Sequence, residues 1–270
     1  MGSQRQSNLV ATFNGLPQPL APRPKKQVVC KMRKTIRTAK KVIIETIYPT
    51  TCPFCDEISK EGICSYCRET VKPIEEPRCF SCGKPVNTQE REFCYDCNKA
   101  KFTYDQGKSL YLHQEKVANG LYRLKYYNQR MNGKIFGREL ATHFQREIRR
   151  WEIEEIIPIP MHHWKKRRRG FNQSEVIAME LGKVLNIPVN TQLVYRIKKT
   201  RPLKELERGE RISNLDGAFG IPKIRRVPKK VLLVDDIYTT GVTINKVAKV
   251  LKKAGCEKVY FLTVSIGQGL

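Results

Sequence analysis

Residues 231–254 constrain the fold of this 270-residue chain more than any other stretch. They open with the apolar run Val231–Val234, whose length and β-branched residues are typical of a strand buried on both faces. Asp235 and Asp236 follow, and then comes a short loop rich in Thr and Gly. Over residues 244–254 apolar side chains recur at helical spacing. The stretch therefore predicts a strand, a loop and a helix in succession.

The loop after the two acids has the composition of a phosphate site. N–H groups at a helix start point outward, Thr hydroxyls add donors, and Gly lets the backbone approach a ligand. The two carboxylates would repel a phosphate, so they face either sugar hydroxyls or a hydrated Mg²⁺. One alternative is a solvated unit without a ligand. The other, the Walker-B strand of an NTPase, requires a GxxxxGK[ST] loop, and the chain has neither that pattern nor GxGxxG.

Eight of the ten cysteines form four CxxC pairs, which are Cys52/Cys55, Cys64/Cys67, Cys79/Cys82 and Cys94/Cys97. Two CxxC turns complete a tetrahedral Cys₄ shell for Zn²⁺ and leave no open position, so we expect two structural zinc ions. The segment is too poor in apolar residues to fold without metal. Sequential ribbons are the simplest pairing, and crossed pairs remain open. Thioredoxin-like redox use is the alternative, but no βαβ pattern surrounds the pairs.

Three further residues relate to the cysteine pattern. Gly83 follows a CxxC pair, where a zinc knuckle tends to need a positive φ. Cys256 stands alone before an apolar run and is expected to be buried by packing. Cys30 is an unassigned thiol.

The charge balance indicates a polyanionic partner. The chain has 51 Lys and Arg against 26 Asp and Glu, a formal net charge of +25. An enzyme with a small anionic substrate needs no such excess, whereas nucleic acid or an anionic membrane surface would use it. The alternative is a basic composition without a partner. Residues 25–41 contain no acid. Such a basic arm is either solvated or binds nucleic acid.

Membrane and export signals are not found in the sequence. No apolar run approaches the roughly 20 residues that span a bilayer, and the N-terminus lacks the apolar core of a signal peptide. Gln6 breaks the N-myristoylation pattern that Gly2 would begin. We therefore expect a cytoplasmic protein with reduced thiols, whose only membrane contact is peripheral.

Composition divides the chain into a basic, disordered extension (1–47), a double zinc-ribbon module (48–103) and an α/β domain (104–270). Periodicity in the last part predicts strands at 109–113, 156–160, 189–196, 231–234 and 258–264, and helices at 116–127, 134–150 and 244–254. A further helix ends at 185, with Asn172 or Ser174 as its cap. Residues 198–220 are polar and without a period, as expected of a lid.

A run of five cations, Lys165, Lys166, Arg167, Arg168 and Arg169, lies between Trp164 and the pair Gly170 and Phe171. Cations neutralise phosphates and aromatic rings stack on bases, which is the combination expected of a single-strand platform. A pyrophosphate loop belonging to the same site as the two acids is the other interpretation, and the two are compatible. His162 and His163 lack a metal partner at helical spacing and are expected in a loop or on the surface.

The stretch after Val234 resembles the ribose-5-phosphate-binding motif of type I phosphoribosyltransferases. The resemblance implies that Asp235 and Asp236 hold the ribose hydroxyls of phosphoribosyl pyrophosphate (PRPP). It also implies that the 5-phosphate is held by Thr239, Thr240, Gly241 and Thr243.

A longer series of motifs over about residues 50–270 is similar to the ComF family. After the zinc cysteines it comprises Leu124-Lys125-Tyr126, Ile157-Pro158-Ile159-Pro160, Arg169-Gly170-Phe171-Asn172-Gln173, Glu210-Arg211 with Asn214, Gly217-Ala218-Phe219 and the acid pair with its Thr-Thr-Gly loop. The resemblance implies a double zinc ribbon ahead of a Rossmann-like parallel sheet of the type I phosphoribosyltransferase kind. Its pyrophosphate-side segment would be residues 161–173 and its lid 198–220. Leu203 departs from the family's usual Gln, and residues 1–47 lie outside the pattern.

The resemblance also implies a role in natural transformation, where single-stranded DNA is handled on the cytoplasmic side alongside a competence helicase and other DNA-uptake proteins. We favour a DNA-uptake accessory protein that binds single-stranded DNA through its basic and zinc-ribbon surfaces and holds a PRPP-type ligand in the α/β domain. A second hypothesis is an active phosphoribosyltransferase, for which no residue stands out as a general base and no acceptor is evident. A third is a regulator that senses PRPP and switches its nucleic-acid affinity.

Overall fold

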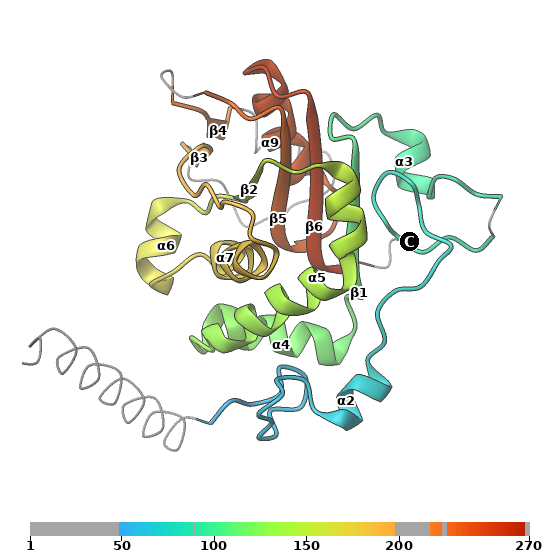
Figure 1. The fold of residues 1–270 in the computed structure, drawn as a ribbon, viewed down its shortest axis with the longest axis vertical. Helices are drawn as coiled ribbons and strands as arrows, with labels where there is room; N and C mark the ends of the chain where they lie inside the picture. The colour runs from blue at the N-terminus through green and yellow to red at the C-terminus, as the bar shows by residue number, and fades with distance from the viewer. Residues whose placement is uncertain (1–48, 89, 198–216, 223–225, 268–270) are drawn as a thin grey trace, which may run out of the picture. The chain divides into compact units, whose positions relative to one another are not determined.

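The computed structural model describes residues 49–88, 90–197, 217–222 and 226–267. These residues belong to one compact unit, Pro49–Leu270. The predicted extension, Cys30 and most of the predicted lid lie outside the described residues. Labelled as in Figure 1, the elements are α2 (Ser65–Thr70), α3 (Tyr95–Lys99), β1 (Gln106–Leu112), α4 (Glu115–Tyr126), α5 (Arg130–Trp151), β2 (Glu155–Pro158), α6 (His163–Arg169), α7 (Gln173–Leu185), β3 (Tyr195–Arg196), β4 (Phe219–Gly220), β5 (Lys230–Tyr238), α9 (Val242–Lys253) and β6 (Lys258–Ile266).

Four parallel strands form the central sheet in the order β1-β6-β5-β2 (Figure 1). The apolar run of β5 supplies both faces of this sheet. Leu232 and Val234 pack into one hydrophobic core, whereas Val231 and Leu233 pack into a second core. All four side chains are fully buried, which explains why this strand is apolar at every position rather than at alternate ones.

Each of the two cores takes in one group of cysteines. The first contains residues of α4, α5 and α7 together with Cys52 and Cys67. The second contains residues of α9 together with Cys79, Cys82 and Cys94. In Figure 1, α5 and α7 lie in front of the sheet and α9 behind it. The zinc-ribbon segment therefore packs into the same compact unit as the sheet, and the predicted boundary at 103/104 stays a prediction.

The end of β2 lies beside the middle of β5, directly before the two acids. Pro158 pairs with Val234, and the N–H of Ile159 donates to the carbonyl of Val234 at 2.9 Å. The carboxyl ends of parallel strands are where open α/β sheets bind ligands. The loop that leaves β2 and the acids of β5 therefore share one edge of the sheet.

Most predicted elements are present with small changes of length, but two predictions of strand extent are wrong. The strand expected at 231–234 continues through both acids to Tyr238, because its pairing with β6 extends to Tyr238 and Ile266. Within residues 189–196, expected as one strand, only β3 and an isolated bridge between Val189 and Ile156 form.

The sequence indicated no secondary structure for the run of cations. In the structure these residues form a short helix, α6, with His162 as its N-cap. The His162 side chain accepts a hydrogen bond from the N–H of Trp164, and the residue lies in the loop before α6 but is buried. His163 is the first residue of α6 and is exposed, as expected of a surface position. Asn172 caps α7 as predicted, by accepting from the N–H of Ser174. No helix among the described residues is long and apolar enough to cross a membrane.

Candidate metal centres and sugar-phosphate site

The two groups of CxxC cysteines begin with the same backbone turn. In the first group, the N–H of Asp56 donates to the carbonyl of Cys52 at 2.9 Å. In the second group, the N–H of Gly83 donates to the carbonyl of Cys79, also at 2.9 Å. Both donors have a positive φ, 68° for Asp56 and 71° for Gly83. The positive φ expected at Gly83 is thus present. Asp56 takes the equivalent position in the first ribbon, because Asp tolerates this region better than most residues.

The structure brings the eight cysteines together as two sequential clusters, one of Cys52, Cys55, Cys64 and Cys67 and the other of Cys79, Cys82, Cys94 and Cys97, with ligand atoms within 4.8 Å of one another in each. The Sγ–Sγ distance is 3.6 Å both between Cys55 and Cys64 and between Cys82 and Cys94. Zn–S bonds of about 2.3 Å in a tetrahedron imply sulfur separations of about 3.8 Å. The clusters therefore fit zinc, and the crossed pairing is not the one adopted.

Each cluster favours the thiolate, the form that binds zinc, at some of its cysteines and not at others. The pKa values of Cys55, Cys67, Cys82 and Cys97 are raised, with burial among the causes at each, whereas those of Cys52, Cys79 and Cys94 are lowered. Burial raises the pKa of Cys52, but hydrogen bonds from the N–H groups of Cys64, Cys55 and Phe54 outweigh it and lower that pKa to about 7. Hydrogen bonds from Cys82, Cys94 and Cys97 lower the pKa of Cys79 well below its ordinary value. With four sulfur ligands on each ion, the zinc would be structural.

The acids of β5 are held in a network of hydrogen bonds and one ion pair. Asp235 Oδ1 accepts from the hydroxyl of Ser174 at 2.7 Å and from the N–H of Asp236 at 2.9 Å. Asp236 Oδ1 accepts from Gln173 Nε2 at 3.2 Å, and Asp236 Oδ2 forms an ion pair with Lys125. The network joins the start of α7 and the end of α4 to the end of β5.

These contacts separate the pKa values of the two carboxyl groups. Burial and the neighbouring charge of Asp236 raise the pKa of Asp235 to about 8, although the bond from Ser174 opposes them. Burial alone would raise the pKa of Asp236, but Lys125 outweighs it and holds that pKa below its ordinary value. Near neutral pH the pair therefore carries one negative charge, matched by Lys125, and one proton.

The loop after β5 leads into α9 through Gly241, whose φ is +73°. A Cβ at Gly241 would lie 2.3 Å from the hydroxyl oxygen of Tyr238, so no larger residue fits without a shift. No side chain caps the N-terminus of α9 and its first turn holds no acid. Thr239 is exposed, while Thr240 and Thr243 are partly exposed. The loop thus offers hydroxyls next to uncapped N–H groups, the arrangement that suits a phosphate.

The two aromatics of residues 164–171 differ in exposure. Trp164 is 57% exposed and Arg167 and Arg168 point to solvent, whereas Phe171 is only 6% exposed. The ring of Phe171 lies beneath Arg130, whose guanidinium carbon is 4.6 Å from the ring centroid. Phe171 therefore packs inside, and Trp164 is the aromatic of this run that faces solvent.

Arg169 connects α6 to the acid pair. Its Nη1 donates to Gln173 Oε1 at 2.6 Å, and Gln173 in turn donates to Asp236. On its other side, the Arg169 guanidinium carbon lies 5.2 Å from the ring centroid of Tyr126, at the end of α4. The cationic helix and the predicted sugar site are thus joined by direct side-chain contacts.

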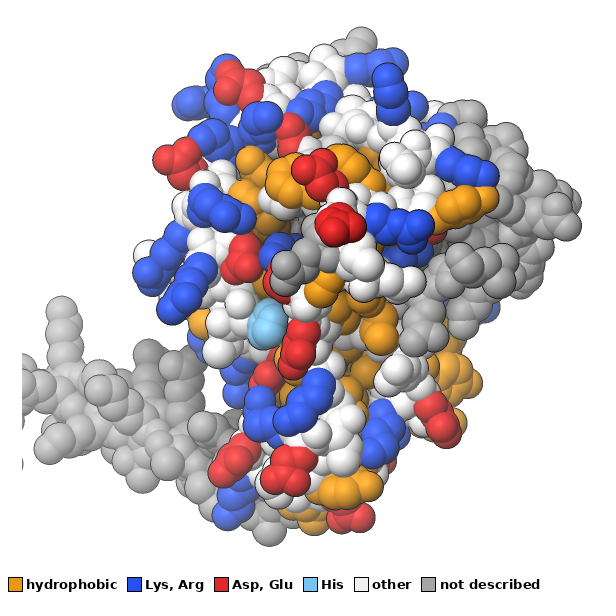
Figure 2. Space-filling model, turned by 90° about the vertical axis from the view of Figure 1, so that its right-hand side faces the viewer, with side chains coloured by type: hydrophobic (Ala, Val, Ile, Leu, Met, Phe, Trp, Pro, Cys, Tyr) orange, Lys and Arg blue, Asp and Glu red, His pale blue; other side chains and the backbone are white. Residues whose placement is uncertain are grey.

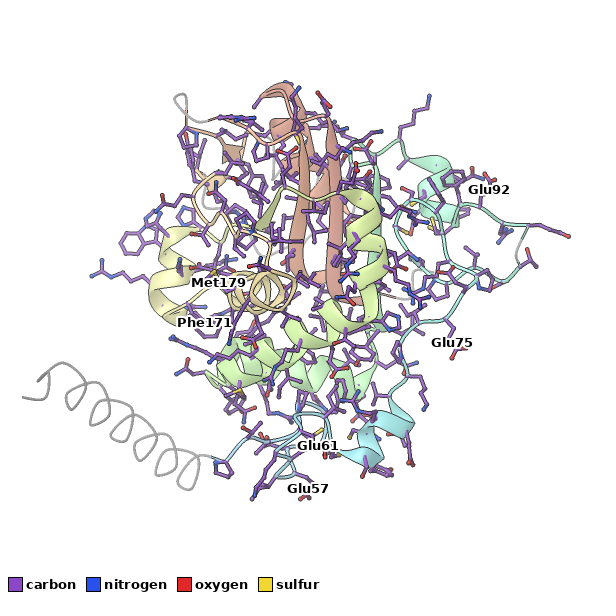
Figure 3. All side chains as sticks on the ribbon, in the orientation of Figure 1. Glu57, Glu61, Glu75, Glu92, Phe171 and Met179 are labelled. Atoms are coloured by element: carbon purple, nitrogen blue, oxygen red, sulfur yellow. The ribbon has the colours of Figure 1, made fainter. Side chains whose placement is uncertain are left out.

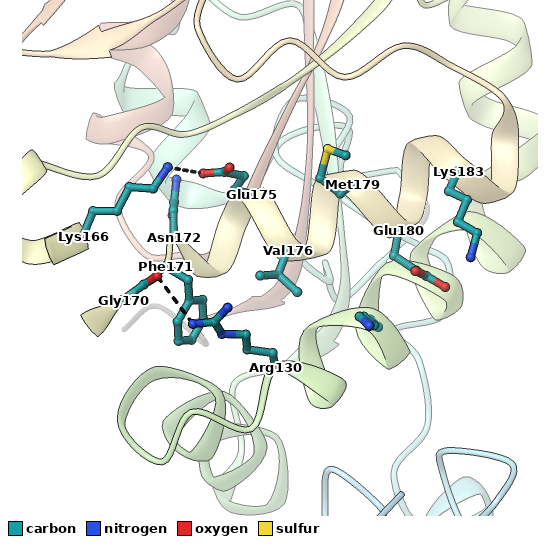
Figure 4. Close-up of a pocket in the computed structure, with 11 residues that line it drawn as sticks. Arg130, Lys166, Gly170, Phe171, Asn172, Glu175, Val176, Met179, Glu180 and Lys183 are labelled. Atoms are coloured by element: carbon teal, nitrogen blue, oxygen red, sulfur yellow. Dashed lines mark hydrogen bonds and ion pairs between the residues drawn. The ribbon is translucent and has the colours of Figure 1, made fainter. Parts of the chain in front are cut away.

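A pocket of about 690 Å³ lies between α5 and α7, beside the end of α6 (Figure 4). Phe171, Val176 and Met179 line it together with cations that include Arg130 and Lys166. Lys166 Nζ donates to Glu175 at 2.7 Å, and Arg130 Nη2 donates to the carbonyl of Gly170 at 3.4 Å (Figure 4). Neither acid of β5 lines this pocket, so it is separate from the predicted sugar site.

The basic excess is unevenly distributed along the chain. Residues 48–103 hold eight Lys and Arg and nine Asp and Glu, so the excess comes from residues 1–47 and 104–270. Figure 3 labels Glu57, Glu61, Glu75 and Glu92 on the ribbon segment, and all four are exposed. On the face drawn in Figure 2, Lys and Arg side chains are interspersed with acidic ones. The zinc ribbons are therefore not the basic part of this chain.

Three residues contact the acids without having been predicted to do so: Lys125, Gln173 and Ser174. Of these, Gln173 ends the segment 161–173 that was expected on the pyrophosphate side. Lys125 was noted as part of a motif without a role, and its signal was a lysine directly after the buried Leu124. Gln173 and Ser174 follow the helix cap, but nothing in the local sequence indicates that they reach β5. Ser174 and Asp235, for example, are separated by 61 residues in the sequence.

Two family models match the chain. Residues 43–98 match a double zinc ribbon domain, and residues 172–265 match a phosphoribosyl transferase domain. The second range begins at the cap of α7 and ends within β6, so it contains the whole acid network apart from Lys125. The expected fold, a double zinc ribbon with a parallel sheet of the type I phosphoribosyltransferase kind, is confirmed.

Relatives of known name cover most of the chain. Competence protein F of Haemophilus influenzae is 31% identical over 207 residues, which are 75% of this chain and 89% of the relative. Competence protein ComFC of Streptococcus pneumoniae is 29% identical, over 73% of this chain and 84% of its own. DNA utilization protein YhgH of Salmonella typhimurium is 27% identical, over 78% of this chain and 94% of the relative. The motifs and these relatives together place the chain in the ComF family, to which competence protein F and ComFC belong.

Proposed function

We propose that this protein is a DNA-uptake accessory protein that handles single-stranded DNA and binds PRPP, or a related ribose 5-phosphate, at the end of β5. The observation that carries the proposal is the acid pair Asp235 and Asp236 next to the uncapped start of α9. Two named relatives are competence proteins and a third is a DNA utilization protein. The role in DNA uptake rests on this kinship together with the charge of the chain.

In the proposed complex each part of the site has a separate task. Asp235 and Asp236 accept hydrogen bonds from ribose hydroxyls, and Thr239, Thr240, Gly241 and Thr243 surround the 5-phosphate. Lys125 and Ser174 keep the two acids oriented in the free protein, because both contact them directly. PRPP would supply an activated ribose carbon, and Mg²⁺ would neutralise its pyrophosphate.

The proposed DNA surface lies on the α/β part of the chain rather than on the ribbons. The ribbons carry no basic excess, whereas α6 alone brings five successive cations. Exposed cations such as Arg167 and Arg168 neutralise phosphates without reading the sequence of the strand. We expect binding that depends on strand length and salt, with partners in DNA uptake that include a competence helicase.

The sugar site is tested by calorimetric titration with PRPP and Mg²⁺. The variant Asp235→Ala/Asp236→Ala should lose binding at least about a hundredfold, because both hydroxyl acceptors are gone, while its zinc content stays at the wild-type level. Gln192→Ala, in a loop outside the acid network, should bind PRPP as the wild type does. Equal PRPP affinity in the double variant and the wild type would refute the assignment.

The DNA part is tested by measuring the affinity for an oligonucleotide as salt is varied. Release of counterions makes the logarithm of the association constant fall with that of the salt concentration, with a slope of about −0.7 for each neutralised phosphate. A flat dependence, or no binding at low salt, would remove DNA handling from the proposal. Pyrophosphate release from PRPP with candidate acceptors, run in parallel, would identify an active transferase.

A PRPP-sensing role is a second candidate, and it is favoured by the contact from Asp236 through Gln173 to Arg169 on α6. A ligand that displaces Lys125 or Gln173 from Asp236 would also shift Arg169. Such coupling requires the same factor in both directions, so PRPP should change DNA affinity as much as DNA changes PRPP affinity. Unchanged DNA affinity at saturating PRPP would exclude this role.

A further inference from the structure

Three exposed tyrosines gather at the C-terminal end of α4. Tyr122, Tyr126 and Tyr127 are 51%, 55% and 67% exposed. The ring centroids of Tyr122 and Tyr126 are 4.6 Å apart, and those of Tyr122 and Tyr127 are 5.9 Å apart. Exposed apolar clusters of this kind mark binding surfaces more often than isolated surface residues do. We call these three residues the tyrosine platform.

The tyrosine platform adjoins the predicted sugar site through two neighbouring residues of α4. Leu124 is fully buried, Lys125 turns to Asp236, and Tyr126 faces solvent beside Arg169. From Tyr126 the contacts run through Arg169 and Gln173 to Asp236, with hydrogen bonds of 2.6 and 3.2 Å in the last two steps. A ligand on the platform therefore lies one arginine away from the acid network.

The chemistry of this surface identifies its occupant. Aromatic rings offer π-faces on which any base can stack, and nearby cations neutralise the backbone of the strand. Arg169 lies against Tyr126, and α6 carries further exposed cations. We propose that the tyrosine platform stacks the bases of single-stranded DNA, next to the ribose site. This inference rests on the proposed function and specifies where on the chain the bases are held.

The platform differs from the aromatic pair that the sequence indicated. Trp164 and Phe171 flank the cations along the chain, but Phe171 is only 6% exposed and lies beneath Arg130. The tyrosines come from a helix about 40 residues earlier, so proximity in the sequence could not reveal them. The cations of α6 and the rings of α4 are neighbours only because both elements reach the same edge of the sheet.

The test compares tyrosine variants of the full chain in oligonucleotide binding at several salt concentrations. Tyr122→Ala/Tyr126→Ala should weaken the affinity by about tenfold or more, as expected for the loss of base stacking. The salt slope should stay as in the wild type, because no charge is removed. Tyr122→Phe/Tyr126→Phe keeps the rings and should retain the affinity. PRPP binding and zinc content serve as checks that the variants are folded.

Two controls separate stacking from other causes. Tyr95→Ala removes a tyrosine of similar exposure that lies below Lys99 on α3, and it should leave the affinity unchanged. An oligonucleotide of equal length without bases should bind the wild type more weakly than the normal strand, and the Ala pair should bind both alike. Wild-type affinity in the Ala pair, or an equal loss in Tyr95→Ala, would overturn the platform.

The outcome also distinguishes this inference from the proposed function. If the wild type shows no salt-dependent binding of single-stranded DNA, the proposed function itself fails. If the wild type binds with a steep salt slope but the Ala and Phe pairs do not differ, only the platform fails.

Discussion

The acid pair shows how two identical side chains in sequence acquire different properties in the fold. Asp236 is paired with Lys125, whereas Asp235 accepts only hydrogen bonds and has a pKa of about 8. The folded state holds a proton on Asp235 up to about pH 8, whereas the unfolded chain releases it near the ordinary value of 3.8. Unfolding therefore releases this proton between those values, and the contribution of Asp235 to stability falls as the pH rises through that window.

Asp235→Asn should remove this dependence. Its amide oxygen can accept the bonds from Ser174 and from the N–H of Asp236, and it carries no charge at any pH. Both pH 5 and pH 8 lie within the window, so we expect the stability advantage of the variant over the wild type to be larger at pH 8 than at pH 5, by about 1 kcal/mol or more for each pH unit. Thermal unfolding of both proteins at the two values measures it. A variant that gains equally at both pH values would contradict the raised pKa of Asp235.

Gly241 offers a second test at the residue scale, with Gly255 as a matched control. Both have a positive φ, but a Cβ at Gly241 would meet Tyr238, whereas a Cβ at Gly255 has no heavy atom within 4 Å. Gly241→Ala should cost about 2 kcal/mol of stability or more and abolish ribose 5-phosphate binding, while Gly255→Ala should cost about 1 kcal/mol and leave binding intact. Chemical denaturation and ligand titration measure both. Equal effects of the two substitutions would argue against a shaped loop.

At the scale of elements, local periodicity predicted most helices because each buries one stripe of apolar residues. The central part of β5 was evident from its four apolar residues, but its continuation to Tyr238 was not. Asp235 and Asp236 are poor strand formers, and only the pairing with β6 holds them in the strand. The segment 189–196 has β-branched residues, but among the described residues it pairs only at Val189 and at β3 rather than along its length. Tertiary pairing, which the local sequence does not encode, decided both cases.

The candidate site was predictable where its residues are contiguous and not where they come from distant elements. The acids, the Thr-Gly loop and the cysteines form short motifs. Lys125, Gln173 and Ser174 reach the acids only because α4 and α7 pack on one face of the sheet. The same holds for the tyrosine platform, whose partners on α6 follow about 40 residues later.

The ribbons provide a prediction at this scale, because each cysteine cluster packs into a different core. Cys79→Ser should reduce the zinc content from about two ions per chain to about one, because three thiolates hold zinc poorly. It should also lower the melting temperature of the whole unit, since Cys79, Cys82 and Cys94 share a core with α9. Metal analysis and calorimetry measure the two effects.

Cys256→Ser is the control for this substitution. Cys256 is buried in the same core but is no zinc ligand, and its Sγ lies 3.3 Å from the carbonyls of Lys229 and Lys258, which a serine hydroxyl can also reach. We expect full zinc content in this variant. Full zinc content in Cys79→Ser as well would show that the ligands are assigned wrongly.

At the scale of the whole molecule, charge and architecture support one function. The zinc ribbons complete both cores and carry no basic excess, which is consistent with a structural role. The α/β part carries the cations, the tyrosine platform and the acid network on connected elements. A small-molecule enzyme would need only the last of these three features, and the other two are consistent with the proposed nucleic-acid partner.

The most direct test of this account measures PRPP and single-stranded DNA binding on one purified sample of the full chain. We predict saturable binding of one PRPP per chain in the presence of Mg²⁺, abolished in Asp235→Ala/Asp236→Ala. On the same sample we predict DNA binding with a steep salt dependence, which the double variant retains when PRPP is absent. A wild-type protein with intact zinc that binds neither ligand, or binds DNA without salt dependence, would contradict the account.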